Sequence, residues 1–292
     1  MQQTSDLPGA EPHDNPATPL KARTFLSMGT VISLTLATDV AAAQAAGQAA
    51  EDELAASAAV VERIFRDLDE TFSLYRPDSE ASRLARGELT LRHASTSMRQ
   101  RYAEAHDWRL LTEGAFNSER PDGVLDLSGI VKGHAIREAG LSLSALGRLN
   151  WCLNAGGDVV ASGSPVPGSS TRTGTSNGSP WLAGIVDPTD RGHLLSAYPL
   201  AADGHHLALA TSGSAERGEH IWRQQRRPPE FVQVSVAAPD IVTADVLATA
   251  VVSGGSAMLD RAVEGWDVAI LAVRADGSLV ATPAFHRTAR AG

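Results

Sequence analysis

The stretch from about Val40 to Thr71 constrains the fold more than any other part of the chain. It is rich in alanine, and its larger apolar residues recur at spacings of three and four. The recurring residues are Leu54, Ala58, Val61, Phe65, Leu68 and Phe72. On a helix with about 3.6 residues per turn, these positions form one apolar stripe. Such a helix has to bury its stripe against another layer, so we expect a long amphipathic helix packed on a β-sheet.

Strands and further helices are indicated before and after this stretch. Residues 30–36 alternate between apolar and polar side chains, as in a half-buried strand. Helices are expected from Ser97 to Glu113 and from Val131 to Leu146, each followed by a glycine. Strands are expected over residues 149–153, 159–162, 181–186, 206–211 and 231–236, with a hairpin over residues 266–282. Because helices and strands intermix, the class is α/β or α+β.

The low-complexity segments suggest a single folded domain. Residues 1–20 are polar and Pro-rich and contain no apolar run of the kind found in signal peptides or membrane spans, so we expect a disordered tail. Residues 164–180 are rich in Ser, Thr, Gly and Pro, which predicts a flexible surface loop. Strands resume on both sides of this loop, so residues 21–292 are expected to form one domain. The lack of an export signal favours a cytoplasmic location without membrane insertion.

The charge balance argues against nucleic acid as a partner. The formal net charge is −9 and the isoelectric point is near 5.5, whereas nucleic acids and anionic membranes attract clustered Lys and Arg. Only two lysines occur, Lys21 and Lys132. The single cysteine, Cys152, lies in an apolar run and cannot form an internal disulfide, so we interpret it as a structural core thiol.

A candidate metal site lies at the start of a helix expected after the strand over residues 231–236. Thr243 is a plausible N-cap, and Asp245 and Thr249 are four residues apart, which places a carboxylate and a hydroxyl on one helical face. Oxygen ligands of this kind suit Mg²⁺, which shares its remaining positions with water and substrate phosphates. From this spacing alone, a capped helix with a solvated Asp245 is the more common explanation.

Two glycine-containing turns are further candidates. Asp126 to Gly133 leads into a helix and places Asp126 and Lys132 near its N-terminus, where N–H groups and a positive charge favour a phosphate. The alternative is a tight turn with a solvated lysine. Asn154 to Asp158 contains two adjacent glycines, which permit a positive φ or a close backbone approach. A simple hairpin turn is the more common explanation for this second segment.

A histidine is the remaining candidate. Ala210 to Ser214 ends a strand with small hydroxyl residues, and His220 follows shortly after. Histidine can act as a general base near neutral pH, although a single histidine in a loop is more often solvated.

Taken together and in order, these segments resemble the ApbE family of FAD:protein FMN transferases. The motifs that carry the resemblance are Met28-Gly29-Thr30, Tyr75 to Ser79, Gly114-Ala115-Phe116, Asp126 to Gly129 with Lys132-Gly133, Asn154 to Asp158, Ala210 to Gly213, His220, and Ala244-Asp245 with Ala248-Thr249. The resemblance runs from about Arg23 to about Val273.

The resemblance implies a fold and an activity. The fold would be α+β, a single T-fold-like domain with mixed sheets, flanking helices and an FAD cleft between two lobes. The activity would be Mg²⁺-dependent cleavage of FAD and attachment of FMN, through a phosphoester, to a Thr or Ser of an acceptor flavoprotein, with release of AMP. Such a phosphoryl transfer needs a divalent ion, donors around the leaving group and a base for the attacking hydroxyl.

The resemblance also assigns roles to single residues. Asp126 and Lys132 would bind FAD, and Asp245 would act in catalysis as well as in metal binding. His220 would be the base that takes the proton of the acceptor hydroxyl. The other cofactor contacts would be Met28, Tyr75, Ala115, Phe116, Asn117 and Trp222. The metal would be held by the Asp245 carboxylate, the Thr249 hydroxyl and the backbone carbonyl of Gly129.

Two departures from the family pattern leave alternatives open. Asn117 stands where the family usually has aspartate, and a basic stretch with Arg223, Arg226 and Arg227 replaces an acidic turn after His220. A base commonly relies on a carboxylate partner, so His220 could be poorly oriented. The alternatives are an FAD pyrophosphatase that releases FMN and AMP, and a catalytically silent FAD-binding protein. Tyr75 leans toward transfer, because some FAD-hydrolysing relatives lack a tyrosine there.

Overall fold

The computed structural model describes residues 20–37, 40–166, 179–201, 205–213 and 229–289. The helices are α1 (Val40–Phe72), α2 (Glu80–Ala85), the 3₁₀ turn η1 (Leu91–His93), α3 (Thr96–Leu111), α4 (Ser128–Ala145), α5 (Ile241–Gly265) and α6 (Pro283–Ala289). The strands are β1 (Leu20–Ser27), β2 (Thr30–Ala37), β3 (Trp151–Ala155), β4 (Asp158–Ser162), β5 (Trp181–Val186), β6 (Leu194–Leu200), β7 (Ala208–Gly213), β8 (Phe231–Ala238), β9 (Ala269–Arg274) and β10 (Leu279–Ala281).

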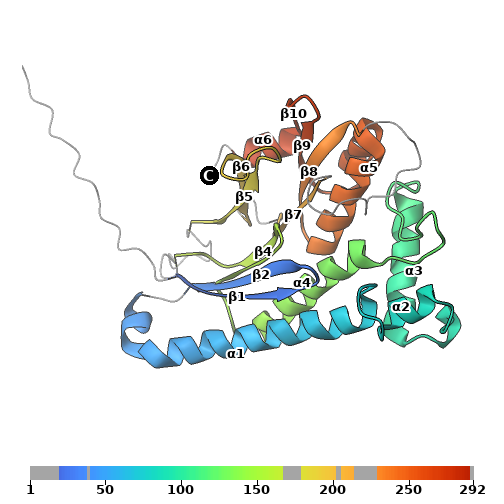
Figure 1. Cartoon of the computed structure of the whole chain (residues 1–292). Coiled ribbons are helices and arrows are strands. Elements are labelled where there is room, and N and C mark those ends of the chain that lie inside the picture. Colours follow the sequence, from blue (N-terminus) through green and yellow to red (C-terminus); the bar gives the residue numbers. More distant parts are fainter. Residues whose placement is uncertain (1–19, 38–39, 167–178, 202–204, 214–228, 290–292) are drawn as a thin grey trace, which may run out of the picture.

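Eight of the strands form one large sheet. Their order is β1-β2-β3-β4-β7-β8-β9-β10, and β5 and β6 form a separate two-stranded sheet. Within the described ranges, every pairing between these named strands is antiparallel. Short connections such as Met28-Gly29 and Gly156-Gly157 allow neighbouring strands to reverse directly. Helices lie on a largely continuous antiparallel sheet, so the expected α+β class is confirmed (Figure 1).

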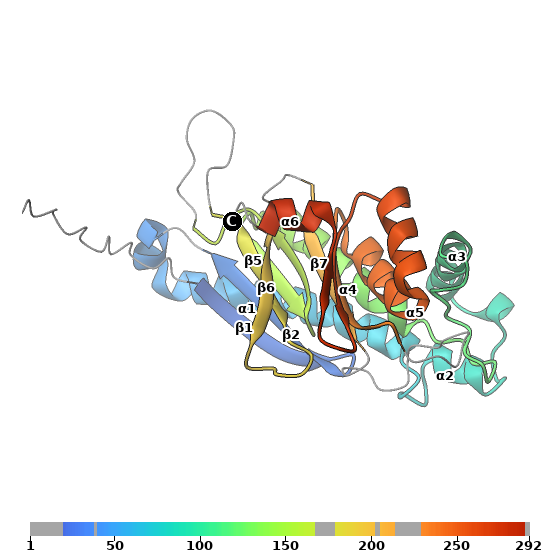
Figure 2. The same ribbon diagram turned by 90° about the horizontal axis from the view of Figure 1, so that it is seen from above.

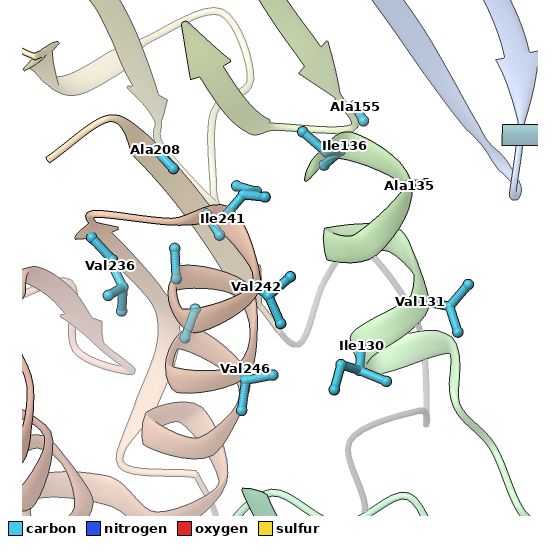
Figure 3. Packing of buried hydrophobic residues seen from close by; sticks show 14 of the residues in the cluster. Ile130, Val131, Ala135, Ile136, Ala155, Ala208, Val236, Ile241, Val242 and Val246 are labelled. Atoms are coloured by element: carbon cyan, nitrogen blue, oxygen red, sulfur yellow. The ribbon is translucent and has the colours of Figure 1, made fainter. Parts of the chain in front are cut away.

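One face of the sheet packs on the three long helices α1, α4 and α5. Ile32 and Leu34 of β2, Leu153 of β3 and Val236 of β8 point to this face and are fully buried. Figure 3 shows Val242 and Val246 of α5 in the same apolar layer, with Ile130 on the part of α4 that faces α5. The expected amphipathic helix is confirmed: Val61 and Phe65 of α1 are buried in this core. The helix is bent at Gly47, whose φ and ψ are not helical.

The opposite face of the sheet carries a second, smaller core. Tyr198 and Leu200 of β6 pack there with Leu209 of β7 and Phe285 of α6. Figure 2 shows α6 and the β5–β6 pair on this side, away from α1. Because a core covers each face of the sheet, consecutive residues of the central strands, which point to opposite faces, are both buried.

Several elements differ from the sequence-based expectations. Strand β1 was not predicted, because its burial pattern is mostly exposed and gives little apolar alternation. Strand β6 and helix α6 were also missed. The expected N-cap of α5, Thr243, is wrong. The helix begins earlier, and Asp240 is the cap: its carboxylate accepts hydrogen bonds from the backbone N–H groups of Val242 and Thr243, both at 3.0 Å.

Helix α5 is also long and apolar enough to cross a membrane by composition alone. Most of its apolar residues are buried against the sheet and α4, so its composition is that of a core helix.

Candidate functional site

Two turns and the end of strand β7 lie at one end of the large sheet. The β1–β2 turn contains Met28 and Gly29, and the β3–β4 turn contains Gly156 and Gly157, all four with positive φ. The β3–β4 turn contacts the start of β2: the N–H of Gly156 donates to the carbonyl of Val31 at 3.1 Å. Strand β7 ends at the same end of the sheet: the N–H of Thr211, near its last residue, donates to Asp158 Oδ1 at 3.1 Å. The expected hairpin at Asn154–Asp158 is therefore confirmed, and it delivers Asp158 to the interior.

Gly156 shows how closely the β3–β4 turn approaches the start of β2. A Cβ atom built on Gly156 would lie 2.3 Å from Thr30 Oγ1, and the residue has a φ of +63°. Only glycine combines this backbone conformation with this contact without strain. The β3–β4 turn is thus held against the start of β2.

A buried lysine and two buried aspartates gather where the β3–β4 turn enters β4. Lys132 of α4 is 5% exposed, Asp158 of β4 is fully buried, and Asp245 of α5 is 1% exposed. The Lys132 ammonium is ion-paired with Asp158 Oδ2 and lies 3.7 Å from Asp245 Oδ1. The alternative of a solvated lysine at this turn is wrong, and so is a solvated Asp245. Packing of α4 and α5 against the same sheet face buries all three groups.

The second predicted metal ligand lies one turn further along α5. Thr249 is half-buried, and its Oγ1 lies 3.0 Å from Ser212 Oγ at the end of β7. Ser212 follows Thr211, whose N–H binds Asp158. The structure therefore brings Lys132, Asp245 and Thr249 to neighbouring positions, and adds Asp158 and Ser212, to which the sequence analysis gave no role.

The helix packing near Asp245 is tight. A Cβ atom on Gly133 would lie 3.2 Å from Val242 Cα and 3.6 Å from Asp245 Oδ2. Glycine at this position lets α4 approach the backbone of α5 closely. This close approach is what places Lys132, the neighbouring residue, within reach of Asp245.

The start of α4 carries the next group of predicted site residues. Asp126 Oδ1 accepts a hydrogen bond from the N–H of Ser128 at 3.0 Å, so its carboxylate already binds the first turn of the helix. Gly129 lies against the buried ring of Phe116: a Cβ there would be 3.3 Å from Phe116 Cε2. Asn117 Oδ1 accepts from the N–H of Glu119 at 3.0 Å.

Ala115 lies against the second half of α5. A Cβ built on Gly254 would be 3.2 Å from Ala115 Cβ. Ala115 and its neighbour Phe116 therefore span the two helices that carry Asp245 and Lys132.

Met28 belongs to a pocket at the same end of the sheet. A cavity of about 570 Å³ is lined by the β1–β2 turn, by α1 and by the loop that follows α1. Its charged lining residues are Glu62, Arg66, Asp69 and Arg76. Tyr75 precedes Arg76 and is 84% exposed. The pocket also includes Thr30, which touches Gly156, so it adjoins the turn that leads to Asp158.

The donor set fits a hard divalent cation. Among the described residues, no three His, Cys, Asp or Glu gather into a metal cluster. The available donors are one carboxylate, Asp245, and a hydroxyl, Thr249, in a largely buried setting. Two aspartates face one ammonium, which leaves the group with a net negative charge. Mixed oxygen donors with excess negative charge suit Mg²⁺ better than a softer metal.

Some predicted residues fall outside the described ranges. His220, Trp222 and the arginines at 223, 226 and 227 lie in residues 214–228, which the structure does not describe. Their roles stay predictions.

A buried histidine outside this site was not singled out from the sequence. His134 of α4 is fully buried, with Nε2 2.8 Å from Glu104 Oε2 and Nδ1 2.7 Å from the Arg137 guanidinium. Burial, together with the charges of Arg101 and Arg137, lowers the pKa of His134 to about 3. The histidine is therefore neutral, and it links α3 to α4. No sequence periodicity distinguishes it from a solvated histidine.

Cys152 is confirmed as a structural thiol. It lies on β3, partly buried against the second core, and burial raises its pKa to about 12. A thiol with such a pKa is not a nucleophile at neutral pH.

Sequence comparison identifies one group of related proteins. The family model described as the ApbE family matches residues 28–119 and 117–271. A protein from Rhodobacter capsulatus named FAD:protein FMN transferase is 32% identical over 184 residues, which cover 59% of this chain and 32% of that protein. The match thus spans about a third of the length of this curated relative.

Solved structures share the fold. The flavin transferase ApbE from Vibrio cholerae has a TM-score of 0.65 at 20% identity, covering 93% of this chain and 99% of that one. The ApbE protein from Thermotoga maritima has a TM-score of 0.70 at 18% identity, covering 93% and 100%. The apo flavinyl transferase ApbE from Pseudomonas stutzeri has a TM-score of 0.66 at 20% identity, covering 94% and 99%. At these identities the likeness establishes the fold.

Proposed function

Because the chain belongs to the ApbE family, we propose that it is a magnesium-dependent FAD:protein FMN transferase. The observation that carries the proposal is the buried group of Lys132, Asp158 and Asp245, together with the pocket at Met28, whose residue Thr30 adjoins the β3–β4 turn. The Rhodobacter relative bears the name of this activity. In the reaction, the hydroxyl oxygen of an acceptor Thr or Ser bonds to the phosphorus of the FMN half of FAD. The bond to the AMP oxygen breaks, and AMP leaves.

The residues divide this work between binding and proton transfer. Asp245, Thr249 and the Gly129 carbonyl would hold Mg²⁺, which neutralises the charge that develops on the pyrophosphate. Lys132 supplies a positive charge that pairs with Asp158 and lies 3.7 Å from Asp245, and the positive end of the α4 dipole favours an anion nearby. His220 takes the proton of the acceptor hydroxyl.

The pocket beside Met28 takes part of the FAD molecule. Its volume of about 570 Å³ lies within the usual range for small-molecule sites. Met28 and Tyr75 contact the flavin, and Ala115, Phe116, Asn117, Asp126 and Trp222 complete the cofactor cleft between the two lobes. The Tyr75 side chain is 84% exposed, and an aromatic ring of this kind can stack on a flavin ring.

Mass spectrometry tests the activity directly. The protein is incubated with FAD, Mg²⁺ and a flavin-acceptor domain, and the acceptor is expected to gain the mass of one FMN. Asp245→Ala should abolish this gain, whereas Asp276→Ala, on the exposed β9–β10 turn, should leave it unchanged. FMN and AMP formed at equal rates with and without acceptor would indicate a pyrophosphatase instead. Bound but intact FAD with every acceptor would indicate a silent FAD-binding protein.

A cytoplasmic location is part of the proposal. It would restrict the acceptors to cytoplasmic flavoproteins or to flavin domains that face the cytoplasm. Fractionation of cells that express the tagged full chain tests this point, and recovery in a membrane or exported fraction would contradict it.

A further inference from the structure

Asp158 makes two contacts that no other described residue combines. Its Oδ2 is ion-paired with the Lys132 ammonium, and its Oδ1 accepts from the N–H of Thr211 at 3.1 Å. The first contact connects Asp158 to Asp245, because the same ammonium lies 3.7 Å from Asp245 Oδ1. The second contact connects Asp158 to Thr249. Ser212, the residue after Thr211, forms a hydrogen bond with the Thr249 hydroxyl.

The Lys132 ammonium is closer to one of the two carboxylates than to the other. It is in direct contact with Asp158 and further, at 3.7 Å, from Asp245. A lysine side chain has a flexible stem and is attracted to any nearby carboxylate, so its position depends on the stronger partner. Asp158 is that partner because the Thr211 N–H and the pairing of β3 with β4 hold it in place.

We propose that Asp158 is a positioning residue: it holds the Lys132 ammonium away from Asp245, so that Asp245 keeps the negative charge needed for a divalent cation. The inference rests on the metal role proposed above for Asp245. It assigns to Asp158 a function in setting the charge of the site, with no contact to the metal.

Substitutions at Asp158 and Lys132 change the net charge of this group in defined steps. The wild-type group contains two aspartates and one lysine and has a net charge of −1. Asp158→Asn makes it neutral and leaves the ammonium to Asp245, while the asparagine oxygen can still accept from Thr211. Lys132→Met makes the net charge −2, and the double variant restores −1. A role of Asp158 only through its hydrogen bond from the Thr211 N–H would not be repaired by removing Lys132.

The experiment measures Mn²⁺ binding by electron paramagnetic resonance on the full chain without nucleotide, so that a contact of Lys132 with phosphate does not enter the result. We expect Asp158→Asn to weaken Mn²⁺ binding at least about tenfold, because a full positive charge about 4 Å from the ligand is worth more than that factor. We expect Lys132→Met to bind more tightly than wild type. The double variant should return to within about threefold of wild type, since it has the wild-type net charge.

The matched control is a substitution on an exposed turn. Asp276→Asn removes one negative charge from the exposed β9–β10 turn and should bind Mn²⁺ as wild type does. Wild-type affinity in Asp158→Asn, a double variant as weak as Asp158→Asn, or no Mn²⁺ binding by wild type would each overturn the inference. If Asp158→Asn does not fold, the Lys132→Met result decides: unchanged or weaker binding overturns the inference. Failure of FMN transfer with the expected Mn²⁺ pattern would refute the proposed function alone.

Discussion

Replacing Lys132 by methionine should destabilise the protein strongly when no divalent cation is present. The side chain is nearly isosteric, so the main loss is the positive charge between the carboxylates of Asp158 and Asp245, which are 0% and 1% exposed. Removing one partner of a buried ion pair typically costs about 3–5 kcal/mol, because the remaining charge stays buried without compensation. Two carboxylates remain here, so we expect a loss toward the upper end of that range.

Urea denaturation with and without Mg²⁺ measures this effect. A cation that binds only the folded state adds about 2.7 kcal/mol of stability at a concentration of 100 Kd, so Mg²⁺ should recover much of the loss in the variant. The matched control is Lys21→Met, which removes the other lysine. Lys21 pairs with Glu51 at 2.8 Å at the surface, where such a pair contributes at most about 1 kcal/mol. A Lys132→Met protein within about 1 kcal/mol of wild type without Mg²⁺ would refute this reasoning.

Three further outcomes are expected. The pKa of His134 is lowered from its ordinary value of 6.5 to about 3, so between these pH values the unfolded chain binds a proton that the folded chain does not. Stability should therefore fall as the pH drops through this window, by at most about 5 kcal/mol, and calorimetry of His134→Gln should show a smaller fall. Gly156→Ala should cost about 1–3 kcal/mol by chemical denaturation, because the new methyl group meets Thr30 at a positive φ, and Gly157→Ala, with open space around it, should cost less. Asp240→Ala should lower the unfolding free energy by about 1 kcal/mol through loss of the α5 cap; an equal or greater loss in Thr243→Ala would contradict the assignment of the cap.

The elements that could be predicted from the sequence are those with a strong local pattern. The stripe of α1 and the alternation of β2 each state which face is buried, and both agree with the structure. Strand β1 lies at the edge of the sheet with mostly exposed residues, so no apolar pattern marks it. The cap of α5 was misplaced by a few residues because Asp240 and Thr243 are both good capping residues, and only the backbone geometry distinguishes them.

The candidate site divides in the same way. Spacing alone placed Asp245 and Thr249 on one helical face, and the order of the motifs indicated the ApbE family, which the comparison confirms. The burial of Lys132 had to come from the packing of α4 against α5, since a lysine at a helix start is usually solvated. Its partner Asp158 belongs to a hairpin that by itself reads only as a tight turn. Sequence determines which groups are present and which face each one takes within its own element. Tertiary structure decides which charges are buried together, because that depends on contacts between segments distant along the chain.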